Sequence, residues 1–280
     1  MQDQSRMRTI LYPTDFSDNS HQAFPYALDV AYLFNAKLIL FNSYTTPYSK
    51  SNVLVSLQEK LKKESENELN KLRDEALSMS KYEKLEIEIY TCQGEFVSSI
   101  SKVARQLSAD CIVMGTKGAS GIKEMFIGSN TLEVIHLAHC PVLVIPEKAD
   151  NAKVNQIAMA TDLRPLKNTE QLDPLFKMAE ICRASIEFVH IIRPEDAESL
   201  ESKTKQAILI DEMAGEIKTS FHFTTNTDII DGLSEYITNR APGMIGMLSR
   251  KHSLFERIFT KSITNKLSFR TEIPLLVMDE

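Results

Sequence analysis

The stretch ILYPTD at residues 10–15 decides how the chain is organised, because it returns as IAMATD at residues 157–162. Both are short apolar runs that end in Thr-Asp, a pattern typical of a buried strand followed by a loop. Self-similarity of this kind marks a repeated structural unit. Two further pairs follow in the same order: AKLILFN at 36–42 with ASIEFVH at 184–190, and CPVLVI at 140–145 with IPLLVM at 273–278.

The repeat predicts two domains of one class, which we place at residues 1–148 and 154–280. A chain of 280 residues is long enough for both to bury their own cores. Within the first domain, short apolar runs alternate with stretches of helical periodicity. The predicted strands are 9–12, 38–41, 85–91, 111–114 and 142–145, and the predicted helices are 19–35, 51–80, 95–107 and 129–138.

Apolar strands that alternate with helices predict a parallel sheet with helices on both faces. The predicted fold class is therefore α/β, with two doubly wound five-stranded parallel-sheet domains in tandem. In such sheets, ligands bind beyond the carboxyl ends of the strands, where the strand order reverses. This rule selects the loop after the first strand, which carries Asp15, and the loop after the fourth strand, which begins at Gly115.

Charge and composition narrow the classes of partner. The net charge of -6 and the pI near 5.6 argue against a general nucleic-acid binder. No apolar stretch approaches the ~20 residues that cross a bilayer, and the first residues have no apolar signal core, so we expect a cytoplasmic protein without membrane contact. His136 and His139 lie three apart on a predicted helix, but no Cys or carboxylate cluster joins them, so we expect no metal site there.

The loop after the fourth strand carries the skeleton Gly-x2-Gly-x9-Gly-Ser, made by Gly115, Gly118, Gly128 and Ser129. Glycine accepts positive φ and lets a ligand approach the main chain closely. The pair Gly128-Ser129 begins the next predicted helix, where free N–H groups and the helix dipole favour an anion. Ser129 either caps that helix or offers its hydroxyl to a phosphate, and Lys117 adds one cation.

A structural interpretation of the same glycines is equally open, because long surface loops are often rich in glycine. The skeleton is not a Walker loop, since no Gly-Lys-Ser/Thr ending is present. It is not the dinucleotide fingerprint either, because these glycines follow the fourth strand and not the first. Spacing alone therefore leaves phosphate binding undecided.

Three motifs in this order resemble the universal stress protein family: YPTDFS at residues 12–17, the glycine skeleton, and CPVLV at residues 140–144. The resemblance covers the first domain throughout and the second in outline, so the chain is similar to the tandem-domain members of that family. It implies a fold of the adenine nucleotide alpha hydrolase type. It also implies an adenine nucleotide as ligand, ATP or else AMP or ADP, with Mg²⁺ as a candidate companion of ATP.

The resemblance also assigns parts of the nucleotide to residues. Asn42-Ser43 stands where the family often has His-Val after the second strand, and a backbone contact to adenine survives that change. The implied phosphate and ribose candidates are Gly115, Lys117, Gly118, Gly128, Ser129 and Asn130, while Pro13, Thr14, Asp15 and Ser43 are candidates for the adenosine end and Met114 lines the pocket.

The second domain lacks the loop glycines. MLSRK at residues 247–251 stands where the first domain has MGTKG at 114–118, and Lys261-Ser262 replaces the last Gly-Ser pair. A Cβ at these places blocks close approach to the main chain, and it strains any residue at positive φ by ~1–2 kcal/mol. We therefore expect no ATP binding in the family manner in the second domain.

Three other features of the second domain have competing interpretations. The basic segment from Arg250 to Lys261 is either a solvated face, which we favour, or an anion site built from side chains. Asp162 either caps the helix that follows or ends its strand. His190 is expected to pack in the core or a loop and not to bind a ligand.

Three functions fit the sequence. The favoured one is a stress-response regulatory protein that binds an adenine nucleotide in the first domain, with the second domain structural. A slow ATPase is the alternative, but Ser129 and Asp15 are the only evident Mg²⁺ ligands and we assign no catalytic residue. The third is a nucleotide-free interaction or scaffold protein.

The resemblance further implies that the domains pair within the chain through their last strands, Val142–Ile145 and Leu275–Met278. Such pairing would cover two exposed sheet edges. A homodimer and an unidentified protein partner stay open.

Overall fold

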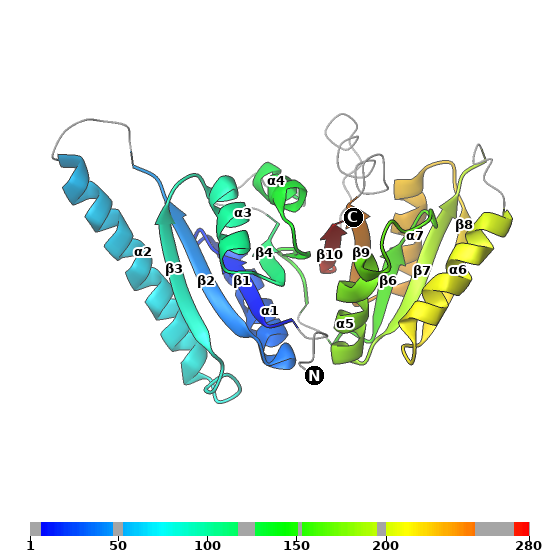
Figure 1. Cartoon of the computed structure of the whole chain (residues 1–280), viewed down its shortest axis with the longest axis horizontal. Coiled ribbons are helices and arrows are strands. Elements are labelled where there is room, and N and C mark those ends of the chain that lie inside the picture. Colours follow the sequence, from blue (N-terminus) through cyan, green and yellow to red (C-terminus); the bar gives the residue numbers. More distant parts are fainter. Residues whose placement is uncertain are drawn as a thin grey trace. The chain divides into compact units, whose positions relative to one another are not determined.

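The computed structural model describes residues 7–46, 53–116, 127–150, 153–194, 200–249 and 272–279 (Figure 1). The chain divides into two compact units, residues 1–147 and residues 148–280, and each unit is described by itself. Among the described helices, none is long and apolar enough to cross a bilayer.

Unit 1 contains a sheet in the order β3-β2-β1-β4-β5, with every neighbouring pair parallel. The strands β4 and β5 are buried at every position, as their continuous apolar sequences predict. Right-handed crossovers place α1 and α2 on one face and α3 and α4 on the other (Figure 1). The elements are β1 Thr9–Pro13, α1 Asp18–Phe34, β2 Lys37–Tyr44, α2 Val53–Ser78, β3 Ile87–Gln93, α3 Phe96–Gln106, β4 Cys111–Gly115, α4 Ser129–Leu137 and β5 Val142–Ile145.

Unit 2 contains a sheet in the order β10-β9-β6-β7-β8, again with parallel neighbours. The order of equivalent strands is the same as in unit 1, so the strand order reverses between β6 and β9, as it reverses between β1 and β4 in unit 1. The elements are β6 Gln156–Ala160, the 3-10 helix η1 Thr169–Leu172, α5 Asp173–Cys182, β7 Ser185–Ile192, α6 Leu200–Ala214, β8 Thr219–Thr225, α7 Ile229–Arg240, β9 Met244–Ser249 and β10 Leu275–Asp279.

The predicted α/β fold with parallel strands is confirmed, and the differences lie at the ends of elements. The second strand continues to Tyr44 instead of ending at Phe41, because its pairing with β3 runs through to the register Tyr44 with Gln93. Asn42 and Ser43 therefore lie within β2 and not after it. A neighbouring strand supplies hydrogen bonds to polar residues as readily as to apolar ones, which a hydropathy pattern does not register.

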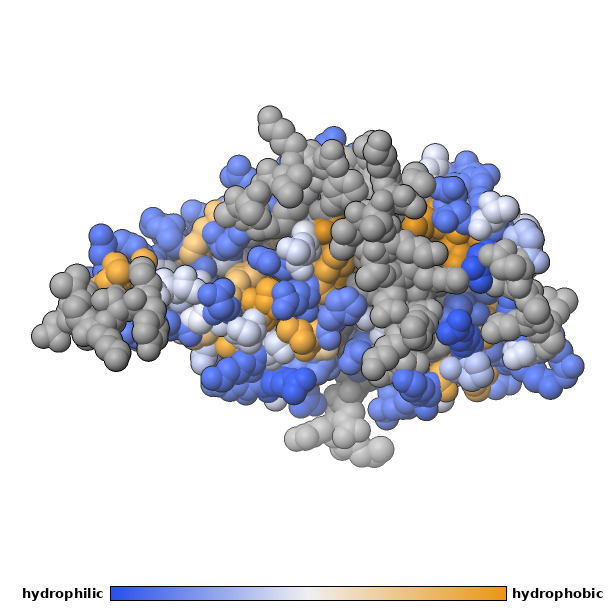
Figure 2. All heavy atoms as spheres, turned by 90° about the horizontal axis from the view of Figure 1, so that it is seen from above, coloured by the Kyte–Doolittle hydropathy of each residue, from blue (hydrophilic) through white to orange (hydrophobic). Residues whose placement is uncertain are grey.

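Helix α2 is amphipathic, as its sequence predicts. Its outer face carries ion pairs one turn apart, such as Lys60 with Glu64, and both side chains are exposed. Figure 2 shows one face of the whole chain, on which the described residues are mostly hydrophilic, with apolar residues between them. The buried residues on the inner face of α2 are Ser65, Leu69, Leu72 and Ala76.

Candidate functional site

The loop that follows β1 is fixed by a dense set of hydrogen bonds around Thr14. This residue is 1% exposed. Its N–H donates to the carbonyl of Phe41 at 2.8 Å, and its carbonyl accepts from Asn42 Nδ2 at 2.7 Å. Its hydroxyl lies 2.9 Å from Ser20 Oγ and accepts from the N–H of Phe16 at 3.0 Å. Each polar group of Thr14 has a partner, so the main chain at Asp15 starts from a rigid point.

The Asp15 carboxylate is held at the entrance of α1. Its Oδ1 accepts from the N–H of Ser17 at 3.1 Å and from the Ser17 hydroxyl at 2.6 Å. Ser17 is in turn the N-cap of α1. The intervening Phe16 has φ 60, an uncommon conformation for a residue with a side chain. The backbone turn at Phe16 and the hydrogen bonds to Ser17 therefore fix the position of the half-buried Asp15 carboxylate.

A buried polar chain lies behind this loop. Asn42 Oδ1 accepts from Ser65 Oγ at 2.7 Å, and the same hydroxyl lies 2.8 Å from Thr91 Oγ1. Through the bond from Asn42 to the carbonyl of Thr14, this chain joins α2 and β3 to the loop after β1. Asn42 and Ser65 are 8% and 5% exposed, so these bonds replace water.

Tyr12 closes the other side of the loop. Burial raises the pKa of its hydroxyl above the ordinary value, so the group stays protonated at neutral pH. The hydroxyl donates to the carbonyl of Ser20 at 2.5 Å, in the first turn of α1. Tyr12 and Thr14 thus both contact Ser20 and hold the first turn of α1 in place.

Gly115 ends β4 against the first turn of α1. A Cβ on this residue would lie 2.9 Å from the carbonyl oxygen of Asn19, and closer still to its side chain. Positive φ is not the reason for the glycine, because the described glycines with positive φ are Gly94 and Gly215. Of the two reasons that the sequence offers for this glycine, positive φ and close approach to the main chain, the structure shows the second. Close approach of two backbones explains this glycine, whether or not a ligand also approaches it.

Hydrogen bonds from α1 and α4 connect the loop after β4 to the loop after β1. Asn19 Nδ2 donates to Thr116 Oγ1 at 3.4 Å, and the carbonyl of Thr116 accepts from the N–H of Gly128 at 2.6 Å. The hydroxyl of Thr131 donates toward the carbonyls of Gly115 and Thr116, each at 3.2 Å. The N-terminus of α4 is thereby held at the carboxyl end of β4, next to the entrance of α1.

The N-cap of α4 is Gly128, and no side chain caps this helix. The suggestion that Ser129 caps it is wrong, because Ser129 is the first helical residue. Gly128 has φ -67 and ψ 157, which any residue adopts, so its role is not conformational. Ser129 and Asn130 are exposed. The first N–H groups of a helix have no partner within it, and with the helix dipole they favour an anion.

The structure brings most of the predicted site residues to one edge of the sheet in unit 1, which we call the carboxyl edge. Lys117 and Gly118 lie outside the described residues. Asn19, Thr116 and Thr131 connect the loops but were not predicted, and no spacing in the sequence marks them. Pro13 ends β1, and Thr14 and Asp15 follow it. Ser43 is half-buried in β2, Met114 is buried in β4, and Gly115 ends β4. Gly128 is the N-cap of α4, and Ser129 and Asn130 are its first residues.

The carboxyl edge of unit 2 repeats the backbone frame with other side chains. The N–H of Thr161 donates to the carbonyl of Val189 at 3.0 Å, and Leu163 has φ 53, like Phe16. Asp162 accepts from the N–H of Arg164 at 3.2 Å and forms an ion pair with its guanidinium at 3.4 Å. Asp162 does not cap the helix that follows, because η1 begins at Thr169 behind its own N-cap Asn168.

His190 takes the place of Asn42 in unit 2. Its Nδ1 lies 2.9 Å from the carbonyl of Thr161 and donates to it, because a carbonyl can only accept. Its Nε2 lies 2.9 Å from Lys203 Nζ. Both residues are 5% exposed, so His190 packs in the core as expected. The basic segment from Arg250 to Lys261 lies outside the described residues.

No group of three or more His, Cys, Asp or Glu side chains is placed to hold a metal ion in the described part of the chain. At the carboxyl edge of unit 1, the oxygen-bearing candidates for Mg²⁺ are Asp15 and Ser129. These are the hard ligands that Mg²⁺ prefers, and they are few, as is usual where a nucleotide phosphate supplies the rest.

Comparisons with known proteins agree with the motifs in unit 1. Residues 7–146 match the model of the universal stress protein family. Over 146 residues, 49% of the chain, the sequence is 34% identical to a universal stress protein of Methanocaldococcus jannaschii, of which it covers 81%. A second universal stress protein of that organism is 32% identical over 155 residues, which are 50% of this chain and 96% of that protein.

Several solved structures resemble the whole chain, and we describe one of them. A universal stress protein from Archaeoglobus fulgidus superposes with a TM-score of 0.72 at 19% identity, over 97% of this chain and 98% of that one. At this identity the likeness concerns the fold.

Proposed function

The chain belongs to the universal stress protein family, and from that membership we propose a stress-response regulatory protein that binds an adenine nucleotide at the carboxyl edge of unit 1. ATP is the proposed ligand, with ADP or AMP as close analogues that share its adenosine. Unit 2 acts as a structural partner without a nucleotide site of the family type.

One observation carries this proposal. The bond of 2.6 Å from the N–H of Gly128 to the carbonyl of Thr116 holds the N-terminus of α4 at the end of β4. The contact of Asn19 with Thr116 joins that point to the loop of Asp15. The N-terminus of α4, which favours anions, and the fixed carboxylate of Asp15 thus lie at the same carboxyl edge of the sheet. This arrangement supports a ligand that has phosphate at one end and hydrogen-bond donors at the other.

The proposed roles follow from these positions. The N–H groups at the start of α4, with Gly128, Ser129 and Asn130, bind phosphate and ribose. Gly115, Lys117 and Gly118 belong to the same loop and contribute its remaining main-chain groups and one cation. Pro13, Thr14, Asp15 and Ser43 contact the adenosine end, and Met114 forms the apolar floor between the two loops.

Binding, and not turnover, is the proposed chemistry. Hydrolysis needs an oriented water and compensation of the charge on the phosphates. At this edge the described residues offer Asp15 and Ser129 toward Mg²⁺ and no base beside them. Nucleotide then regulates a protein partner to the extent that the bound and free states of unit 1 differ in affinity for that partner.

Isothermal titration of the full chain with ATP, ADP and AMP tests the proposal, together with mass spectrometry of any ligand that copurifies without added nucleotide. We expect saturable binding of one nucleotide per chain. Absence of heat and of a thermal shift at millimolar nucleotide would support the nucleotide-free scaffold protein instead. Steady release of phosphate from ATP would support the ATPase.

The variant Gly128→Ala sharpens this test. Because Gly128 has φ -67, alanine fits the backbone without strain, and the thermal midpoint without nucleotide should not fall. The added Cβ stands where phosphate must approach, so we expect affinity for ATP to drop by about tenfold or more, equal to 1.4 kcal/mol. Unchanged affinity would remove the helix N-terminus from the site.

Three further expectations stay proposals. They are a cytoplasmic location, pairing of the two domains through their last strands, and association of two chains. Size-exclusion chromatography with light scattering, with and without ATP, measures the last of them.

A further inference from the structure

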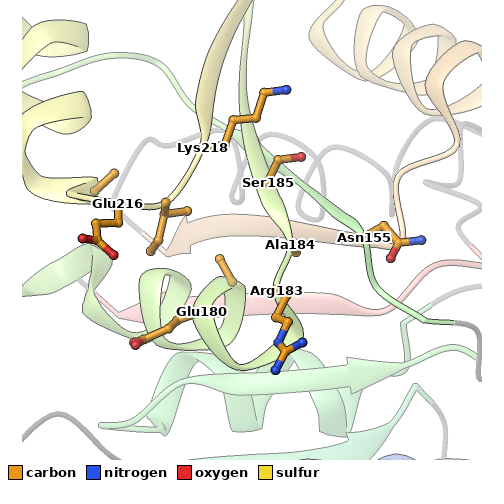
Figure 3. Close-up of a pocket in the computed structure, with 10 residues that line it drawn as sticks. Asn155, Glu180, Arg183, Ala184, Ser185, Glu216 and Lys218 are labelled. Carbon is orange, nitrogen blue, oxygen red and sulfur yellow. The ribbon is translucent and has the colours of Figure 1, made fainter.

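An open pocket lies at the opposite end of the sheet in unit 2, which we call the amino edge (Figure 3). It has a volume of about 690 Å³ and forms where α5 and α6 end and the strands begin. Asn155 precedes β6, Ser185 begins β7 and Lys218 precedes β8, and all three line it. The pocket is therefore separate from the carboxyl edge, where the family's nucleotide site is proposed.

Three alanines form the floor of the pocket. Ala179, Ala184 and Ala214 are 0%, 6% and 5% exposed. Ala184 donates its N–H to the carbonyl of Ala179 at 2.8 Å, directly after Arg183 ends α5 with φ 53. Two tight helix ends with small side chains leave a hollow that larger residues would fill.

Unit 1 shows what such residues look like. The N–H of Asn35 donates to the carbonyl of Tyr32, as that of Arg183 donates to the carbonyl of Glu180, so Tyr32 and Glu180 are equivalent. Just before β3, Leu85 donates to the carbonyl of Tyr82, and just before β8, Ile217 donates to that of Ala214. Counted back from the strand, Tyr82 and Ala214 therefore take the same place, although Ala214 still belongs to α6 and Tyr82 lies in the turn after α2.

An aromatic cluster fills this place in unit 1. The rings of Tyr32 and Tyr82 meet edge to face at 6.0 Å between centroids, and Tyr82 is 7% exposed. The hydroxyl of Tyr82 donates to Asp29 at 2.6 Å, and the ammonium of Lys81 lies over both rings. In unit 1, the half-exposed Tyr32 and the buried Tyr82 thus stand where Glu180 and Ala214 line the pocket in unit 2, so the side chains at these two places shape the pocket and not the fold class alone.

Charges of both signs surround the pocket. Figure 3 shows the carboxylates of Glu180 and Glu216 on one side, with Arg183 and Asn155 on the other and Lys218 above. Within the described residues, none of the four charged side chains forms an ion pair. The C-terminal ends of α5 and α6, which carry partial negative charge, lie at the residues that line the pocket.

We propose that this pocket binds a small zwitterion of the size of an amino acid or dipeptide. The ammonium of the ligand pairs with Glu180 and Glu216, and its carboxylate pairs with Arg183 and the amide of Asn155. Its side chain lies on the alanine floor. A volume of several hundred Å³ is typical of pockets for small ligands, and an apolar floor with a few convergent polar groups gives them orientation.

The dipeptide alanyl-leucine is the probe, titrated into the ¹⁵N-labelled full chain and followed by ¹H–¹⁵N spectra. We expect saturable shifts at residues 183–186 and 214–218 in the millimolar range, roughly 1 mM. N-acetylated and C-amidated forms of the dipeptide should each bind about tenfold more weakly, because each lacks one charge. Absence of shifts at about 10 mM, or an acetylated or amidated form that binds equally, would overturn the proposal.

Variants separate the pocket from a nonspecific surface effect. Ala214→Tyr introduces the residue of unit 1 and should abolish the shifts, while Tyr82→Ala in unit 1 should leave them unchanged. Glu216→Gln and Arg183→Gln change exposed side chains and retain the fold, so they test the charges should Ala214→Tyr fail to fold; each should weaken binding about tenfold. Binding that survives both charge variants would refute the assignment. None of these results depends on whether unit 1 binds a nucleotide.

Discussion

The carboxyl edges of the two units share a backbone and differ in chemistry. Thr14 and Thr161 both donate to the neighbouring strand, and Phe16 and Leu163 both turn with positive φ. Asp15, however, accepts from the N-cap serine of the next helix, whereas Asp162 pairs with an arginine. The fold thus fixes the position of the carboxylate, and the two residues after it decide whether that carboxylate faces a cation of its own chain.

The buried groups behind the two loops differ in the same way. In unit 1, Asn42 and Ser65 form a neutral chain to the carbonyl of Thr14. In unit 2, His190 and Lys203 stand in their places, so a histidine and a lysine side chain lie in the core. The neutral hydrogen-bonded chain of Asn42 and Ser65 holds the loop after β1 without adding charge to it. The charge at the carboxyl edge of unit 1 therefore comes from Asp15 and from the N-terminus of α4.

The largest expected effect concerns the strand glycines. Gly115→Ala places a Cβ 2.9 Å from the main-chain carbonyl of Asn19, so α1 must shift, and we expect a loss of about 3 kcal/mol in the free energy of unfolding. The control is Gly246→Ala in unit 2, where the nearest atom is the flexible Met159 Sδ at 3.0 Å. Urea unfolding measures both, and equal losses would show that the packing of α1 on β4 is not special.

The neutral chain gives the next largest effect. Asn42→Ala removes the side-chain donor to the carbonyl of Thr14 and leaves the hydroxyl of Ser65 with Thr91 alone, which should cost about 2 kcal/mol. Asn42→His copies unit 2 and can donate to the carbonyl through Nδ1 and accept from Ser65 through Nε2, so the loss should be smaller. If both variants lose the same stability in thermal unfolding, the hydrogen bonds are not what holds this loop.

The two carboxylates should differ in their effect on ligand affinity. Asp15→Ala should lower the affinity for ATP by about tenfold, or 1.4 kcal/mol, because it removes a fixed acceptor from the proposed adenosine end. Asp162→Ala should leave it unchanged. Titration calorimetry on both variants compares them, and a stronger effect of Asp162 would move the proposed site to unit 2.

The smallest effect is a difference at high pH. Unit 2 has Met159 where unit 1 has Tyr12, whose pKa burial raises above that of an unfolded tyrosine. Below about pH 10 the hydrogen bond of Tyr12 to Ser20 contributes fully, and Tyr12→Phe should cost about 1 kcal/mol. As the pH rises above 10, Tyr12 ionises in the unfolded chain but not in the folded one, so this contribution to stability is lost. The difference in the free energy of unfolding between the unchanged protein and Tyr12→Phe should therefore close. A gap that stays constant from pH 8 to about pH 11 would contradict the assignment.

The order of elements was predictable because apolar runs report burial directly. The stretch at residues 142–145 was predicted as a strand, and β5 has those bounds. The end of β2 at Tyr44 was not predicted, because the last residues of this strand are polar and depend on pairing with β3. Likewise Ser129 looked like a cap, but the bond of Gly128 to Thr116 fixes where α4 begins, and Thr116 lies twelve residues earlier, at the other end of the same loop.

The sequence by itself determined the α/β class, the internal likeness of the two halves, and the loss of the glycine skeleton in the second, because periodicity and glycine content are local properties. Only the tertiary structure decided that Gly115 serves the approach of α1, and that Lys203 contacts His190 as Ser65 contacts Asn42. It also decided that Tyr32 and Tyr82 in unit 1 stand where Glu180 and Ala214 line a pocket in unit 2. The reason is physical: each of these features depends on which distant atoms the fold brings within van der Waals or hydrogen-bond distance, and no local pattern encodes that distance.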